Sequence, residues 1–470
     1  MKQLFGLALA ATLLAGCATT QAPAVLPSPA APSQWQTALP HNGQTSELTQ
    51  WWTHFNDPVL VQLQAAAQQA SPQLASALAR IGRARASRAG ADAAARPSLD
   101  AVGSASTGRS APGQASSQQA SLGLQAGWEL DLFGGVAAAR RAEQARLEGA
   151  QAAWHDARVS LAAEVATSYT LLRTCEAQLS TARQDADSRA QTSRLTELSA
   201  KAGLTAPADA ALVRGGAAQS RSQATNQQAQ CETLIKGLVE TTDLAEAELR
   251  RLLAPGRALL PQPRPLVPTS LPAQLLGQRP DLAQTARNVA AAAADQTRTH
   301  AQQRPRVMLS GSLAGVSLRS NGFQTTGMTW SIGPLSVSLP LFDAGARAAN
   351  TAAAKLTYDE AVALYAAQLR RAVREVESAL VSLEATGLRE VDAQAAALDF
   401  EASLVATQAR QRGGLASVLD LEVARRNALQ AQSALIELKR ERATAWITLY
   451  RALGGGWAAA EWVSTAAKQP

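Results

Sequence analysis

Cysteine is the residue type most able to do chemistry in this chain of 470 residues, which has three of them. Cys17 follows one cation, Lys2, and an apolar run over residues 4–14 that leads into Leu-Ala-Gly-Cys. A short basic end, an apolar stretch and small residues before a break are typical of a secretory signal peptide. We therefore expect residues 1–16 to be a lipoprotein signal and Cys17 to carry a lipid. The alternative is an ordinary signal with a chance cysteine.

The residues after Cys17 predict where this lipid would hold the chain. Residues 18–20 are Ala-Thr-Thr and contain no Asp that would favour retention at the inner membrane. Residues 17–46 are rich in Pro and Ala, a composition typical of an extended tether. We expect a protein that is lipid-anchored at the outer membrane and extends into the periplasm.

The other two cysteines, Cys175 and Cys231, are equally spaced about Gly203, since 203 − 175 = 28 and 231 − 203 = 28. If Gly203 ends one helix and an antiparallel helix follows, both cysteines lie at the same height, roughly 42 Å from the turn. The periplasm is oxidising. We therefore predict a Cys175–Cys231 disulfide. The alternative is two small buried thiols whose side chains point apart.

No other set of residues indicates catalysis. The four histidines, His41, His54, His155 and His300, fit no metal-ligand spacing. Glu129 and Asp131 come closest to a carboxylate pair, but a structural role at a strand-to-helix junction explains them. There is no GxSxG sequence and no phosphate loop. We expect no enzyme, no metal and no cofactor apart from the lipid on Cys17.

The charged residues do not indicate a nucleic-acid partner. The net charge is +7, and arginines such as Arg80, Arg83, Arg85 and Arg88 are scattered along helical segments. No basic block is interleaved with aromatic residues. We interpret these arginines as solvated helix faces.

The elements that position these residues occur twice, because the sequence contains an internal duplication. One set of matches has an offset of 208: Pro72, Leu74, Ala75, Ala86, Arg96 and Pro97 recur as Pro280, Leu282, Ala283, Ala294, Arg304 and Pro305. Leu132-Phe133 recurs at 209 as Leu341-Phe342. A third set has an offset of 211: Gly203, Leu204, Asp209 and Arg214 recur as Gly414, Leu415, Asp420 and Arg425.

Each half follows the same order of elements. A helix (72–95 and 280–303) precedes a Gly/Ser-rich region with period-two alternation (97–132 and 305–341), divided into two strands by breaks at 108–117 and 319–327. A long helix follows. Residues 136–202 contain no Pro and one Gly, so a helix there would be roughly 100 Å long. In the second half a heptad seam appears at Val362, Ala366, Leu369, Val373, Val376, Leu380 and Leu383. Returning helices are expected over 205–253 and 415–453, after Gly203 and Gly413-Gly414.

The duplication predicts two hairpins, hence four strands per chain. Four strands cannot close a membrane barrel, and open sheet edges are not tolerated in lipid. After Cys17 no apolar run approaches the roughly 18–20 residues of a spanning helix. The strands must therefore be pooled among subunits, in an oligomer that is part barrel and part helical tube.

Seven sequence pieces in this order resemble the TolC-like outer membrane factors, in particular the lipoprotein branch of the efflux type (NodT/OprM-like). The pieces are Cys17, Trp51-Trp52 with Phe55-Asn56-Asp57-Pro58, Trp128 to Gly134, Arg279-Pro280-Asp281, Leu341-Phe342-Asp343 with Gly345, Gly414-Leu415, and Leu453 to Trp457. The resemblance implies a mainly α fold with a β membrane part. As a homotrimer it would form a 12-stranded transmembrane β-barrel, continued by a periplasmic α-helical barrel.

The resemblance also implies domains and partners. We expect a signal peptide (1–16), a tether (17–46), a first repeat over 47–260 with its helical hairpin at 136–253, a second repeat over 261–457 with its helical hairpin at 344–453, and a tail (458–470). A channel subunit of this kind would be a passive exit duct in the outer membrane lipid, docked to a periplasmic adaptor (membrane fusion) protein and an inner-membrane pump of the RND type. The alternatives are the duct of an ABC-driven type I secretion system and a structural lipoprotein without a pore.

In this family the helical tube ends in a constriction lined with carboxylates. The resemblance places this constriction at the turn after Gly414. Asp420 falls on the family's first aperture acid, whereas Val423 replaces the second and Glu422 lies one position earlier. Such a ring would attract cations. Asp420 could equally sit in a first helical turn, favoured by the helix dipole. Asp209 is the corresponding acid of the first half, where Pro207 changes the turn around it.

Overall fold

A computed structural model describes residues 52, 55–109, 116–262, 277–320 and 322–455 of the chain. Cys17, Trp51, Gly456 and Trp457 lie outside the described residues. The chain divides into two compact units. One, here called the strand unit, contains residues 78–152 and 283–368; the other, the hairpin unit, contains the described residues before 78, residues 153–282 and those from 369 onward. Each unit therefore draws on both halves of the sequence.

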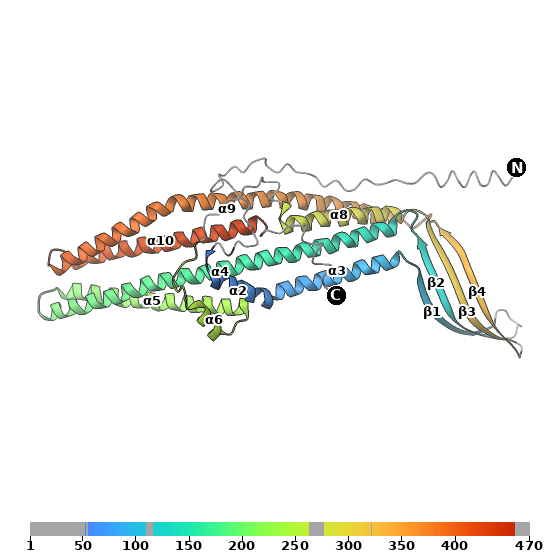
Figure 1. Ribbon diagram of the computed structural model, residues 1–470, viewed down its shortest axis with the longest axis horizontal. Helices are drawn as coiled ribbons and strands as arrows, with labels where there is room; N and C mark the ends of the chain where they lie inside the picture. Colours follow the sequence, from blue (N-terminus) through green and yellow to red (C-terminus); the bar gives the residue numbers. More distant parts are fainter. Residues whose placement is uncertain (1–51, 53–54, 110–115, 263–276, 321, 456–470) are drawn as a thin grey trace. The chain divides into compact units, whose positions relative to one another are not determined.

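The strand unit contains one antiparallel sheet of four strands in the order β1-β2-β3-β4 (Figure 1). The strands are β1 (Ser98–Gly108), β2 (Ser117–Leu130), β3 (Arg306–Ser320) and β4 (Phe323–Ser338). Each half supplies one hairpin within the range that the alternation predicts. The break predicted at 319–327 is too long, because Phe323 already pairs with Ser320. Of the two glycines in the predicted break, only Gly322 is in the turn, whereas Gly327 lies within β4.

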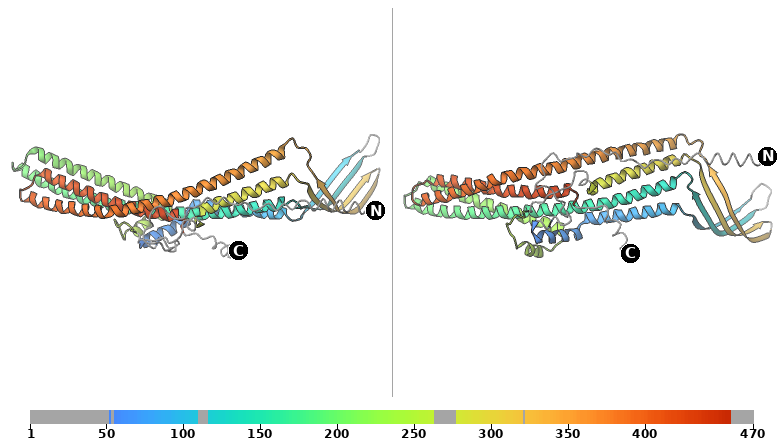
Figure 2. Two further views of the ribbon diagram at one scale, coloured as in Figure 1. Left: turned by 90° about the horizontal axis from the view of Figure 1, so that it is seen from above. Right: turned by 45° about the horizontal axis from the view of Figure 1, so that its top comes forward.

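Four helices follow the order of the strands in this unit (Figure 2). They are α3 (Pro72–Ala94), α4 (Gly135–Lys201), α8 (Pro280–Ala301) and α9 (Ala346–Arg412), and each continues into the hairpin unit. Asp92 on α3 pairs with Arg140 on α4, and Arg287 on α8 pairs with Glu148 on α4. Gln303, just after α8, donates a hydrogen bond to Thr351 on α9. The contacts thus run in the sequence α3, α4, α8, α9.

The two long helices begin in the same way. A glycine with positive φ stands before each, Gly134 (φ 72°) before α4 and Gly345 (φ 87°) before α9. An aspartate then satisfies the first free backbone N–H groups: Asp131 accepts from Val136 (3.0 Å) and from Ala137 (2.7 Å). Asp343 accepts likewise from the backbone at the start of α9. Both helices have 67 residues.

The hairpin unit pairs α4 with α5 (Pro207–Thr242) and α9 with α10 (Val418–Ala452). The single returning helix predicted over 205–253 is wrong, because the chain breaks after α5 and continues as α6 (Glu246–Leu253). Asp243 is in the left-handed conformation (φ 54°), and its N–H closes α5 on Val239 O. No glycine or proline marks this break in the sequence.

A hydrophobic core holds the hairpin unit together. It joins the short helix α2 (Pro58–Ala70) to α4, α5, α6, α9 and α10. Its most buried leucines are Leu60, Leu63, Leu172, Leu238, Leu249, Leu380, Leu449 and Leu453. Every residue of the predicted heptad seam on α9 is buried or half-buried. None of the helices in the described ranges is both long and apolar enough to cross a membrane.

Candidate functional site

One face of the sheet is formed by every second residue of each strand and is apolar over the part nearer the helices, whereas Gln118, Arg319 and Gln324 lie on it toward the far end. Register sets the apolar side chains side by side: Leu124 on β2 lies opposite Leu313 on β3, which lies opposite Trp330 on β4. These side chains are exposed, and Trp330 and Ile332 are 74% and 86% exposed. The face also includes Leu99, Leu122, Trp128, Leu309, Met328, Leu335 and Val337.

The opposite face of the sheet is mainly polar, although Val102, Met308, Val316, Leu318 and Phe323 also lie on it. Hydroxyl pairs bridge neighbouring strands, Ser104 to Ser121 at 2.7 Å and Ser312 to Ser331 at 2.8 Å. Near the helices, Arg306 on β3 donates to Glu129 on β2 at 2.7 Å. Glu129 and Asp131 therefore have separate structural roles, one in an ion pair and the other at the start of α4. A sheet apolar on one face and polar on the other suits a wall between lipid and water.

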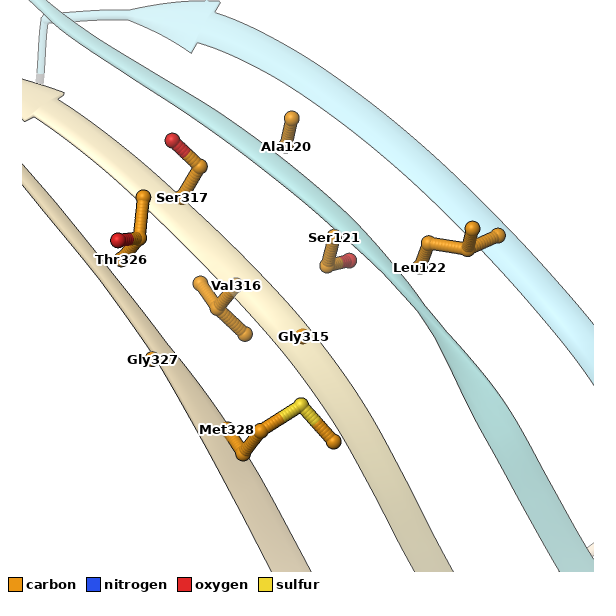
Figure 3. A pocket seen from close by; sticks show the side chains of 9 residues that line it. All are labelled: Ala120, Ser121, Leu122, Gly315, Val316, Ser317, Thr326, Gly327 and Met328. Carbon is orange, nitrogen blue, oxygen red and sulfur yellow. The ribbon is translucent and has the colours of Figure 1, made fainter.

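A shallow hollow in the sheet runs over β2, β3 and β4 (Figure 3). Figure 3 shows Met328 extending toward Gly315, where a Cβ would lie 3.6 Å from the sulfur. Neighbouring lining residues, such as Ser121 and Leu122, belong to opposite faces of the sheet, so their side chains do not converge. The hollow is a feature of side-chain spacing in the sheet and does not assemble a binding site.

The two helical hairpins turn in the same way. Gly203 and Gly414 have φ values of 76° and 74°, which a residue with a side chain rarely adopts. In each turn the next residue donates to the carbonyl five residues back: Leu204 to Ser199 at 2.9 Å, and Leu415 to Arg410 at 2.8 Å. Such a Schellman motif satisfies the last carbonyls of the helix. Asp209 and Asp420 then occupy the same position in the first turns of α5 and α10.

Asp420 is exposed and forms a capping box with Ser417. Its carboxylate accepts from the Ser417 hydroxyl (2.7 Å) and backbone N–H (2.9 Å), while the Asp420 N–H donates to Ser417 Oγ (3.1 Å). These hydrogen bonds to Ser417 lower the pKa of Asp420 from its ordinary value. The carboxylate is therefore held charged at the turn. Asp209 is also exposed, but Ala206 in the capping position gives α5 no side-chain hydrogen bond.

Glu422 is part of an ion network between α10 and α4. It pairs with Arg425 (2.6 Å) on its own helix and with Arg189 on α4. Arg425 is only 3% exposed, so burial lowers the pKa of its guanidinium while Glu422 opposes this shift. Arg425 also donates to Ser188 (3.0 Å) and Thr192 (3.2 Å) of α4. Both contacts of Glu422 are ion pairs within the chain, so these contacts do not indicate a free carboxylate at an aperture.

Cys175 on α4 and Cys231 on α5 face each other. Their sulfurs lie 2.09 Å apart and their Cα atoms 5.6 Å apart, with 56 residues of separation along the chain. Both residues are buried within the core of the hairpin unit. The equal spacing about Gly203 therefore corresponds to equal height on the two helices.

Two further motif residues, Arg279 and Trp52, hold neighbouring elements of the hairpin unit together. Arg279 of the Arg-Pro-Asp piece is buried and donates to Asp281 (2.6 Å), to Glu375 (2.8 Å) and to the carbonyl of Ala452 (2.9 Å). It thereby joins the start of α8 to α9 and to the end of α10. Trp52 packs on Tyr450 with ring centroids 4.6 Å apart.

Known proteins are similar to this chain over most of its length. The family model described as outer membrane efflux protein matches residues 63–241 and 271–455. The toluene efflux pump outer membrane protein TtgI of Pseudomonas putida is 29% identical over 455 residues, or 92% of this chain and 94% of that protein. Outer membrane protein OprJ of Pseudomonas aeruginosa is 30% identical over 73% of this chain and 71% of that protein.

Among solved structures, the outer-membrane channel OprN is similar with a TM-score of 0.81 and 28% identity. The match covers 92% of this chain and 99% of that chain. The similarities extend over the duplicated halves, the amphipathic sheet and both helical hairpins. This chain therefore belongs to the outer membrane efflux protein family, and its place is the outer membrane.

Proposed function

We propose that three copies of this efflux protein form one passive exit duct across the outer membrane. Three sheets would supply 12 strands, more than the roughly eight at which closed barrels begin. The helices would continue the barrel into the periplasm as a tube. A periplasmic adaptor and an inner-membrane pump would deliver the cargo. Drugs or other small molecules are the cargo class that the relatives' names favour, since these names include toluene and antibiotic efflux.

The single observation that carries this proposal is the amphipathic sheet with two unpaired edges. Within the described chain, β1 and β4 each pair on one side only. Backbone N–H and C=O groups at such edges cost several kcal/mol each when left unpaired in lipid. Pairing β4 of one copy with β1 of the next would remove both edges. It would also place the apolar face toward the lipid and the polar face toward the water.

The carboxylate of Asp420 gives the duct a charged element at its helical end. Three copies would place three charged Asp420 side chains at the corresponding turns. A ring of acids attracts cations and disfavours anions. Because the capping box lowers the pKa of Asp420, the carboxylate keeps its charge as the pH falls through the ordinary aspartate value, and loses it only at lower pH.

Planar-bilayer recording of the purified full chain tests this proposal. We expect stepwise channels that favour cations. Asp420→Asn should lower the cation-to-anion permeability ratio. The control is Asp399→Asn, which removes an exposed acid on α9 and should leave the ratio unchanged. Verified oligomers that conduct no ions would overturn the proposal.

Efflux in cells tests the link to a pump. Deleting the gene should raise the accumulation of a fluorescent efflux substrate, and the full chain supplied in trans should restore the parent level. Unchanged accumulation of every substrate tried, with normal secretion lost, would instead favour an ABC-driven secretion duct.

A further inference from the structure

Among the residues that the structure describes, the order of helices in the strand unit leaves two helices without a neighbour on one side. Contacts run from α3 to α4, then to α8 and α9, so α4 and α8 each have a neighbour on both sides (Figures 1 and 2). Helices α3 and α9 are the two ends, and they adjoin the edge strands β1 and β4. The free sides of α3 and α9 are therefore the surfaces that a second copy would meet.

The duplication tells which positions on these helices correspond. Helix α9 repeats α4 with an offset of 211 residues, because both have 67 residues, follow a positive-φ glycine and end in the same turn. Helix α3 corresponds to α8 with an offset of 208, from Pro72 and Pro280 at their starts. The contact of α9 with α3 of another copy would therefore repeat the contact of α4 with α8 within one chain.

The α4–α8 contact is close and charged. Glu148 on α4 pairs with Arg287 on α8 at 3.0 Å. A Cβ placed on Gly149 would lie 3.5 Å from the Cβ of Arg287 and 3.6 Å from Oδ1 of Asn288. One face of α4 is buried along this stretch, at Ala138, Ala142 and Ala145.

The same positions on α9 are open. Ala349, Ala353 and Leu356 correspond to the three buried alanines, and all are exposed, Leu356 to 69%. Asp359 corresponds to Glu148 and carries the same charge, and Glu360 corresponds to Gly149. In the described part of the chain, Asp359 pairs with exposed Lys355 at 3.4 Å, and Glu360 has no ion pair.

The corresponding positions on α3 carry the opposite charge. Ala79 and Arg80 correspond to Arg287 and Asn288, and Arg83 lies one turn farther along the same side of the helix. Arg80 and Arg83 are exposed and have no ion pair within the described ranges. Two cations therefore stand where the duplication predicts the neighbour of two anions.

We propose that Arg80 and Arg83 on α3 of one copy pair with Asp359 and Glu360 on α9 of the next copy. This inference rests on the oligomeric duct proposed above and identifies the helical surface that joins its subunits. Contacts of α3 with α3, or of α9 with α9, would bring like charges together and are disfavoured. The charges thus select a head-to-tail ring and oppose a two-fold dimer.

Disulfide trapping tests the geometry. In the full chain, Ala79→Cys combined with Glu360→Cys should link subunits, because the corresponding Gly149 and Arg287 positions have a Cβ separation suited to a disulfide. Non-reducing gels of membranes should show a covalent trimer that reductant dissolves. The matched control is Arg85→Cys with Glu360→Cys, since Arg85 lies roughly 120° around α3 from Ala79 and should not link.

Charge reversal tests the ion pairs. Arg80→Glu with Arg83→Glu should raise the monomer fraction after mild heating in detergent by roughly tenfold, since like charges then face each other. Adding Asp359→Arg and Glu360→Arg should restore the parent value. Arg85→Glu, which changes the same charge on another side of α3, should leave the trimer unaffected.

The two proposals fail separately. If the parent protein forms conducting trimers but the Ala79/Glu360 cysteine pair does not link, or the restoring reversals do not rescue the trimer, the assigned surface is wrong and the duct stands. If the parent protein is monomeric in the membrane, both the duct and this interface are overturned.

Discussion

At the scale of the residue, the helices hide charges that their sequence does not distinguish. Arg173, Arg279 and Arg425 are all buried and each reaches at least one carboxylate. Arg279 is marked by its Arg-Pro-Asp sequence, but nothing in the local pattern separates Arg173 and Arg425 from exposed arginines such as Arg80, because both kinds occur in helices rich in alanine. Only the packing of a second helix decides burial. Breaking a buried pair costs about 3–5 kcal/mol, so these residues fix how the helices meet.

The prediction of a disulfide between the two cysteines depends only on the position of one turn. We predict that Cys175 and Cys231 are bonded in the mature protein, so that alkylation without reductant modifies neither. Replacing both by Ser should lower the free energy of unfolding by about 2–4 kcal/mol, since the bond closes a long loop. Thermal unfolding with and without reductant measures this.

The Ser variant serves as its own control, because reductant should no longer change its melting temperature. Intact mass spectrometry that finds two free thiols in the parent protein would contradict the prediction.

At the scale of the element, periodicity predicted which segments are strands or helices, but it did not predict where a helix is interrupted. Alternation located all four strands, because a sheet with one apolar face must repeat every second residue. The break between α5 and α6 was missed since Asp243 provides a left-handed residue where glycine is usual. Helix α2 was also missed; Asp57 starts it by accepting from Val59 and Leu60, and the segment is short. The ion network of Arg425 could not be predicted from the sequence, because it depends on α4 and α10 lying side by side.

The two faces of the sheet predict opposite effects for neighbouring residues on β4. Ile332→Arg puts a charge on the apolar face and should cost roughly 2–4 kcal/mol if that face meets the bilayer. Ser331→Arg changes the adjacent residue on the polar face and should be tolerated. The yield of heat-resistant oligomer in outer-membrane fractions distinguishes the two.

Equal yields for Ile332→Arg and Ser331→Arg would mean that the faces are not sorted between lipid and water. Reduced yield for Ser331→Arg alone would mean that they are sorted the other way.

At the scale of the whole molecule, the sheet would make a lipid on Cys17 a second anchor. Cys17 lies outside the described residues, and its lipidation remains a prediction. A single acyl-anchored arm holds a membrane weakly compared with a closed barrel. We expect Cys17→Ser, exported with a cleavable signal, still to form membrane-embedded trimers at reduced yield. Membrane fractionation and native gels measure this, and recovery of soluble monomer alone would contradict it.

The unpaired edges of β1 and β4 also bear on the time before assembly. Between export and ring closure, each copy presents to water two rows of free backbone groups and an apolar face that includes Trp330 and Ile332. Such edges are templates for aggregation. A new subunit therefore needs either rapid encounter with two others or a periplasmic chaperone that covers the sheet. The time that it spends unassembled should lengthen as its concentration drops, because encounters become rarer. The feature that makes the duct possible also makes the isolated subunit a hazard to the cell.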